Sequence, residues 1–81
     1  MVNTSGFKQW LFENTTYSHE VINDMASRMK RADNLLEFYN DEIYLFYLEK
    51  QDGFKQLSIS VRSQVRKSVK LYLSFQQNER G

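Results

Sequence analysis

The chain has 81 residues, of which 41% are hydrophobic and 15% aromatic, and its formal net charge is +1. This size fits one folded domain over residues 1–81, and the apolar content exceeds that of disordered chains. The absence of cysteine excludes a disulfide framework, a thiolate metal site and a cysteine nucleophile, and a single histidine excludes a histidine-rich metal cage. No apolar run approaches the ~18 residues of a membrane span, so we expect a cytoplasmic chain without a metal, a cofactor or a membrane contact.

The lack of proline and the presence of only three glycines argue against an all-β domain, which needs turn residues every ~8 to 12 positions. Helices are therefore expected. The first helix is predicted over residues 7–14, with Thr4 or Ser5 as its N-cap. Its apolar residues follow the i, i+3, i+4 spacing of one helix face and are Phe7, Trp10 and Leu11. We interpret Trp10 as the side chain that closes this helix onto the core.

A longer second helix is predicted over residues 19–39, after a polar break and with Ser18 as its N-cap. At about 100° per residue, one stripe collects its apolar side chains, which are Val21, Ile22, Met25, Met29, Ala32, Leu35, Leu36 and Tyr39. This is the strongest helical pattern in the chain. His19 stands at the start of the helix, and we interpret it as a surface residue because the sequence places no catalytic partner beside it.

A third helix is predicted over residues 41–51, ending before Asp52 and Gly53. Its aromatic content on all sides predicts deep burial, and core packing is favoured over a base-stacking platform, which is usually a sheet surface. Asp41 and Glu42 resemble a metal or general-acid pair only superficially, since the first turn of a helix favours acidic residues in any case. We interpret them as capping residues.

The fourth helix is predicted over residues 60–76, with Ser58 or Ser60 as its N-cap and a polar tail at 77–81. Its buried stripe is expected to contain Val61, Val65, Val69, Tyr72 and Phe75. Residues 57–61 also alternate with the period of a strand, but a lone strand would have no partner. The expected fold is all-α, a compact four-helix bundle.

Charge is segregated along the chain. Residues 32–52 carry six acidic side chains against one lysine, and residues 53–81 carry six basic side chains against one glutamate. In the fourth helix Arg62, Arg66 and Lys70 stand four residues apart and form one stripe. A phosphate backbone would relieve the repulsion between them, and so would an acidic neighbour inside the fold. The same stripe also fits an ordinary solvated helix face.

Further donors lie on the same helices. Lys67 and the amide of Gln64 suit a phosphate and a base edge, respectively. The second helix adds three basic residues, which are Arg28, Lys30 and Arg31. Arg28 falls inside the apolar arc, so it either pairs with Asp24 at i, i+4 while its stem follows the core, or presents its guanidinium beside Arg31.

Several segments follow the order of features in a known module. They are Phe7-Lys-Gln-Trp-Leu11, Asn14-Thr-Thr-Tyr-Ser18, Ser27-Arg-Met-Lys-Arg-Ala32 and Val65-Arg-Lys-Ser-Val-Lys-Leu-Tyr-Leu-Ser-Phe75. In this order the chain resembles the helical N-terminal core-binding domain of tyrosine recombinases and phage integrases, a SAM-like module. The resemblance covers most of the chain, although none of these segments is a diagnostic signature.

The resemblance implies a DNA-binding module, the N-terminal part of a protein of DNA integration or recombination or of another DNA-acting protein. Its second and fourth helices would face the duplex, with the acidic third helix away from it. The basic residues that it assigns to DNA are Arg28, Lys30, Arg31, Arg62, Arg66, Lys67 and Lys70. The family's catalytic residues belong to a separate C-terminal domain, so this chain alone is expected neither to cut nor to join DNA. It is expected to be a monomer. The alternative is a helical protein-interaction module whose acidic and basic faces associate head to tail.

Overall fold

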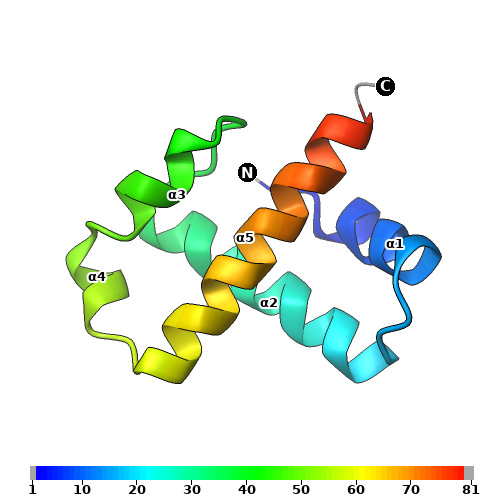
Figure 1. Cartoon of the computed structure of the whole chain (residues 1–81), viewed down its shortest axis with the longest axis horizontal. Coiled ribbons are helices and arrows are strands. Elements are labelled where there is room, and N and C mark those ends of the chain that lie inside the picture. The colour runs from blue at the N-terminus through cyan, green and yellow to red at the C-terminus, as the bar shows by residue number, and fades with distance from the viewer. Residues whose placement is uncertain (1, 80–81) are drawn as a thin grey trace.

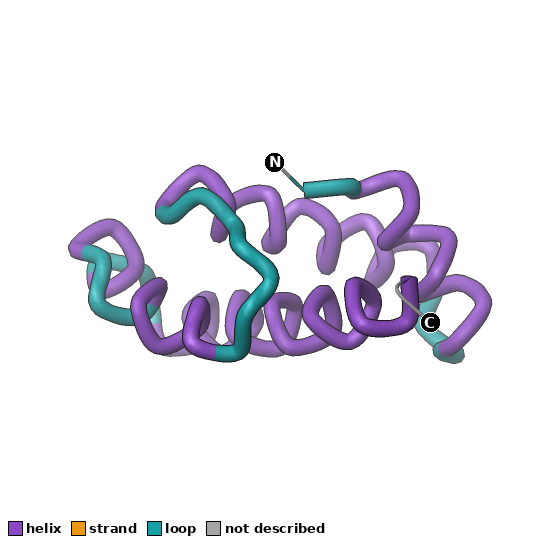
Figure 2. Tube along the Cα trace, turned by 90° about the horizontal axis from the view of Figure 1, so that it is seen from above, coloured by secondary structure: helices purple, strands orange, loops and turns teal. Residues whose placement is uncertain are grey.

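The computed structural model describes residues 2–79, and every regular element in that range is a helix (Figure 1). The helices are α1 (Thr4–Asn14), α2 (His19–Leu35), α3 (Ile43–Leu48), α4 (Asp52–Lys55) and α5 (Ile59–Glu79). α2 and α5 cross at the centre, with α1 to one side and α3 and α4 to the other. The bundle is flat, with extents of 34 × 26 × 16 Å (Figure 2). The predicted all-α bundle is confirmed, with five described helices where four were expected.

The core lies between α2 and α5, which share the most extensive helix contact in the described chain. Their buried side chains are Ile22, Met25, Ala26, Met29, Ala32, Val65, Ser68, Val69, Tyr72, Leu73 and Phe75. Ser68 is the buried polar residue of this set, and its hydroxyl donates to Sδ of Met25 at 3.2 Å. The apolar stripes predicted for the two long helices are thus confirmed in their central parts, whereas Val21 and Tyr39 at the ends of the first stripe are exposed.

An aromatic cluster fastens α1 to α5. Phe7 is fully buried, and its ring centroid lies 5.1 Å from that of Tyr72 and 5.9 Å from that of Phe75. Trp10 is only partly buried and touches the edge of this cluster, 6.0 Å from the Phe75 ring centroid. The prediction that Trp10 closes the helix onto the core is therefore wrong in part: Trp10 packs against the core, but it is not among the buried residues of the helix. Phe7 and Leu11 occupy the inner positions, because the helix presents them directly to the crossing of α2 and α5.

α2 ends at Leu35, short of the predicted end at residue 39. Leu36 has an extended backbone, and the buried hydroxyl of Tyr44 lies 2.6 Å from the Leu36 carbonyl oxygen and 3.1 Å from that of Ala32. A side chain from α3 thereby satisfies carbonyls at the end of α2. Burial, with smaller contributions from Asp33 and Tyr39, raises the pKa of Tyr44 above its ordinary value, so its hydroxyl remains a donor at neutral pH.

The predicted third helix is interrupted. α3 ends at Leu48, the amides of Lys50 and Gln51 then bond to carbonyls three residues back, and Gln51 is extended before α4 begins. Tyr44 and Leu48, which are four positions apart, are buried in the core, and Leu45 is partly buried against it. The outward side chains are Ile43, Phe46 and Tyr47, which are 46%, 55% and 46% exposed. The expectation of all-round burial is therefore wrong.

Polar side chains begin the helices much as the sequence suggests. Ser18 and Ser58 accept hydrogen bonds from the amides three residues later, which confirms both as N-caps. The Asp41 carboxylate accepts from the Ile43 amide at 2.9 Å, as expected for a capping residue. The first helix differs, because Asn3 caps it through the Gly6 amide in place of Thr4 or Ser5.

α5 begins one residue before its predicted start and extends past its predicted end. Ile59 opens the helix, so residues 57–61 do not form the strand considered as an alternative. The helix continues through residues 77–79, since no glycine or proline interrupts it there. Residues 80–81 of the predicted tail lie outside the described residues.

Candidate nucleic-acid interface

The seven basic residues predicted to contact DNA lie on α2 and α5, but the fold distributes them over several surfaces. Arg28, Lys30 and Arg31 stand on α2, and Arg62, Arg66, Lys67 and Lys70 stand on α5. Two open hollows flank the N-terminal half of α5, one against α2 and the other against α3 and α4. Each hollow takes two of the predicted arginines.

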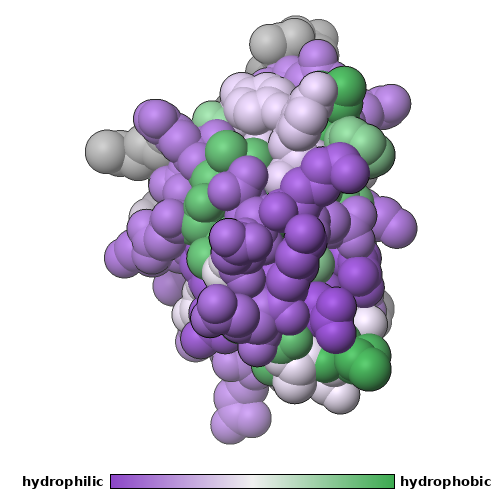
Figure 3. Space-filling view, turned by 90° about the vertical axis from the view of Figure 1, so that its left-hand side faces the viewer, coloured by the Kyte–Doolittle hydropathy of each residue, from purple (hydrophilic) through white to green (hydrophobic). Residues whose placement is uncertain are grey.

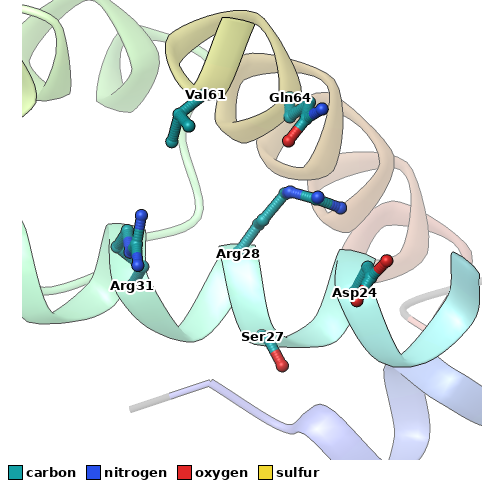
Figure 4. Close-up of a pocket in the computed structure, with 6 residues that line it drawn as sticks. All are labelled: Asp24, Ser27, Arg28, Arg31, Val61 and Gln64. Atoms are coloured by element: carbon teal, nitrogen blue, oxygen red, sulfur yellow. The ribbon is translucent and has the colours of Figure 1, made fainter. Parts of the chain in front are cut away.

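The first surface, called here the α2/α5 hollow, has a volume of about 220 Å³. Its lining consists of Asp24, Ser27, Arg28, Arg31, Val61 and Gln64. Figure 4 shows the Arg28 side chain reaching from α2 toward Gln64 on α5, with Arg31 one turn farther along α2 near Val61. Two guanidinium groups, one amide and the Asp24 carboxylate therefore line one open hollow.

The position of Arg28 fits neither of the two alternatives left by the sequence in full. It is half-buried, and in the described part of the chain it makes no ion pair with Asp24, four residues earlier on the same helix. Its side chain reaches toward Gln64 on α5, and its guanidinium lies on the Asp24 side, away from Arg31 (Figure 4).

Lys30 does not line the α2/α5 hollow. At about 100° per residue it lies about 160° around α2 from Arg28, and its side chain is exposed. Its neighbours in sequence therefore face α5 while Lys30 does not. A Lys30 variant is therefore a matched control for variants of Arg28 and Arg31.

The second surface, called here the α3/α5 hollow, has a volume of about 450 Å³ and lies against α3 and α4. Its lining consists of Phe46, Glu49, Lys50, Phe54, Lys55, Arg62 and Arg66. Figure 3 shows the end of the molecule formed by α3 and α4, where hydrophilic side chains cover most of the surface. Sequence reasoning misses Lys50 and Lys55, because helical periodicity does not show that the break after α3 brings them toward α5.

Arg66 has an acidic partner inside the fold. Its Nε donates to the Glu49 carboxylate in an ion pair, and its guanidinium carbon lies 5.5 Å from the Phe54 ring centroid. Glu49, which directly follows α3, thus neutralises part of the positive charge that Arg62, Arg66 and Lys70 place on α5. For Arg66 the alternative of an acidic neighbour inside the fold is therefore confirmed.

The remaining two lysines of α5 are exposed and diverge. The amine of Lys67 lies 5.3 Å from the Tyr17 ring centroid, next to the connection between α1 and α2. Lys70 lines a shallow hollow beside Glu42 and Leu45 of the α3 region. The stripe of Arg62, Arg66 and Lys70 therefore follows the flank of α5 that faces α3, and Lys67 follows the solvent side.

Other candidate chemistry is weak on the described surface. His19 is exposed, as predicted, and stacks on Phe12 with a centroid distance of 5.8 Å. Among the described residues, His, Asp and Glu side chains nowhere gather in a group of three that could hold a metal ion. None of the described helices is long and apolar enough to cross a membrane.

Comparison with known proteins adds no relative. No protein-family model, no curated protein and no solved structure matches this chain. What the chain does has to be inferred from its own residues.

Proposed function

We propose that this chain is a non-catalytic module that binds duplex DNA through the surface formed by α2 and α5. The observation that carries the proposal is the convergence of Arg28, Arg31 and Gln64 on the α2/α5 hollow. Arginine forks match the geometry of phosphate oxygens, and a glutamine amide suits the edge of a base. Such a combination positions a protein on the DNA backbone and leaves one group for base contact.

The proposed footprint is narrower than the seven residues taken from the sequence. Arg28 and Arg31 are its centre because both line the α2/α5 hollow beside Gln64, with Asp24 as the acidic residue of the lining. The exposed Lys67 follows Gln64 by three residues on α5 and adds a positive charge. Arg62 and Arg66 lie on the opposite flank of α5, where Glu49 offsets part of their charge. Lys30 and Lys70 lie farther from the hollow and are assigned at most peripheral contacts.

The resemblance to recombinase and integrase core-binding domains supports the same proposal from the sequence. In such an arrangement a separate C-terminal domain performs the chemistry, and the helical module positions the DNA. We propose that this chain plays that positioning role and acts in the cytoplasm, the compartment in which it would meet its DNA.

The alternative, head-to-tail association through acidic and basic faces, has less charge available than the sequence suggests. Glu49 and Arg66 already pair within one molecule. We therefore expect a monomer in sedimentation without DNA. Self-association that is abolished by Glu42→Lys, at an exposed acid before α3, would favour the interaction module instead.

The test of DNA binding is fluorescence anisotropy with random duplex DNA at several salt concentrations. An Arg28→Ala/Arg31→Ala variant should bind DNA more weakly. The slope of log K against log salt concentration should become less steep by about 1.8, the value for two lost phosphate contacts. Lys30→Ala removes a positive charge from the same helix and should change binding much less. Absence of binding at protein concentrations near ~100 μM, or an equal loss in Lys30→Ala, would contradict the proposal.

A further inference from the structure

The α3/α5 hollow is strongly basic. Four of its seven lining residues are cationic and one, Glu49, is anionic. The cations come from three places in the sequence: Lys50 follows α3, Lys55 ends α4, and Arg62 and Arg66 lie on α5. Only folding brings them together. Like charges at one site repel one another, and a bound anion offsets that repulsion.

Two of these cations already have partners within the chain. Arg66 pairs with Glu49 and lies over Phe54, and the amine of Lys50 lies 4.5 Å from the Phe46 ring centroid. Arg62 differs. Its side chain is half-buried, and its Nε is fully buried without a hydrogen-bond partner among the described residues.

A buried donor of a charged group without an acceptor is costly, and native proteins satisfy almost all such groups. No described protein atom supplies an acceptor for this Nε, and the Arg62 side chain lines the hollow. The excess of three positive charges in the lining favours an anion there.

We propose that the α3/α5 hollow binds a phosphate group, with Arg62 as its main donor and Lys55 as a second cation. A phosphate monoester carries about 1.5 to 2 negative charges near neutral pH and a backbone phosphodiester carries one, and both offer several acceptor oxygens to the cations of this lining. The planar guanidinium of arginine is suited to hold it. The phosphate comes either from a small phosphorylated molecule or from a nucleic-acid backbone.

This inference does not depend on the proposed DNA-binding function. The α3/α5 hollow lies on the other flank of α5 from Arg28 and Arg31. Variants of one hollow can therefore be tested without altering the other. Loss of phosphate binding and loss of DNA binding are separate results.

The experiment follows the arginine Nε–Hε signals by NMR while pyrophosphate is added at constant ionic strength. The Arg62 signal should move downfield and saturate, because its Nε gains an acceptor. Arg62→Gln should weaken pyrophosphate binding about tenfold or more, since it removes a charge-assisted donor. Lys55→Ala, at an exposed position that should not affect folding, should weaken it several-fold, while Lys30→Ala should leave it unchanged.

Short duplex DNA then distinguishes the two sources. If DNA moves the Arg62 signal and pyrophosphate reverses the shift, the site takes backbone phosphate; if only pyrophosphate moves it, the site takes a small phosphorylated molecule. Either result supports the proposal. An Arg62 signal that moves with neither ligand, or an affinity for pyrophosphate that Lys55→Ala and Lys30→Ala reduce equally, would overturn it.

Discussion

The carboxylate of Glu49, at the end of α3, pairs with the guanidinium of Arg66 on α5. This contact joins the acidic and the basic parts of the sequence inside one molecule. Both side chains are 36% exposed, so water screens the pair and its contribution to stability is small. Its main effect is on the surface, where it lowers the positive potential beside Arg62.

Removal of the acid should therefore strengthen anion binding. We expect Glu49→Gln to bind duplex DNA about two- to fivefold more tightly at ~0.01 M salt, because the Debye length of ~30 Å then lets a repulsive charge on one flank of α5 act on DNA bound at the other. Its free energy of unfolding should change by less than ~1 kcal/mol. Anisotropy titration and urea denaturation measure the two effects.

Glu13→Gln provides the control, since it makes the same charge change at an exposed position on α1. It should have a smaller effect on DNA affinity than Glu49→Gln. Weaker DNA binding by Glu49→Gln would show that Glu49 positions Arg66 productively and would contradict this account of the pair.

A second prediction concerns the hydroxyl of Tyr44, which contacts the carbonyl oxygens of Ala32 and Leu36. Tyr44→Phe retains the ring but leaves these carbonyls without that donor, so we expect a loss of ~1 to 3 kcal/mol in the free energy of unfolding. Tyr47→Phe, whose side chain is 46% exposed, should change it by less than ~0.5 kcal/mol. Denaturant unfolding of both variants is the measurement. Equal stability of the two would mean that the hydroxyl does not support the end of α2.

The raised pKa of Tyr44 predicts a dependence of stability on alkaline pH. The folded state keeps this phenol protonated, whereas the unfolded chain ionises it near pH ~10. The contribution of the protonated Tyr44 to the free energy of unfolding is therefore intact below pH ~10. It is lost as the pH rises further, by up to ~1.4 kcal/mol per pH unit. The stability difference between wild type and Tyr44→Phe should shrink from about pH 10 upward. Parallel curves over that range would contradict a buried, neutral phenol.

The periodicity of the sequence predicts the two long helices well, because each contributes an apolar stripe to one crossing. It does not predict where the second helix ends, since that depends on the Tyr44 hydroxyl arriving from eight residues beyond Leu36. It also misses the division between α3 and α4. Local propensity gives no account of Phe46 and Tyr47, which face outward although they are strongly apolar.

The candidate site is predicted in part. Helical spacing correctly places Arg62 and Arg66 on one flank of α5. Helical spacing cannot say which element faces that flank of α5. The region of α3 and α4 lies there, and it contributes Glu49 as well as Lys50 and Lys55. Arg28 is anticipated as an arginine at the edge of the core, but its approach to Gln64 depends on how α2 and α5 cross (Figure 4).

The last prediction compares the two aromatic residues on the inner side of α1. Phe7 is fully buried against Tyr72 and Phe75, so Phe7→Ala should cost ~3 to 5 kcal/mol, a large share of the stability of a small domain. Trp10 is only partly buried at the edge of the same cluster. Trp10→Ala should cost less than Phe7→Ala, because part of its ring remains in water in the folded state. Thermal and urea unfolding rank the two variants, and a larger loss for Trp10→Ala would place the tryptophan, not Phe7, at the contact that holds α1 onto α5.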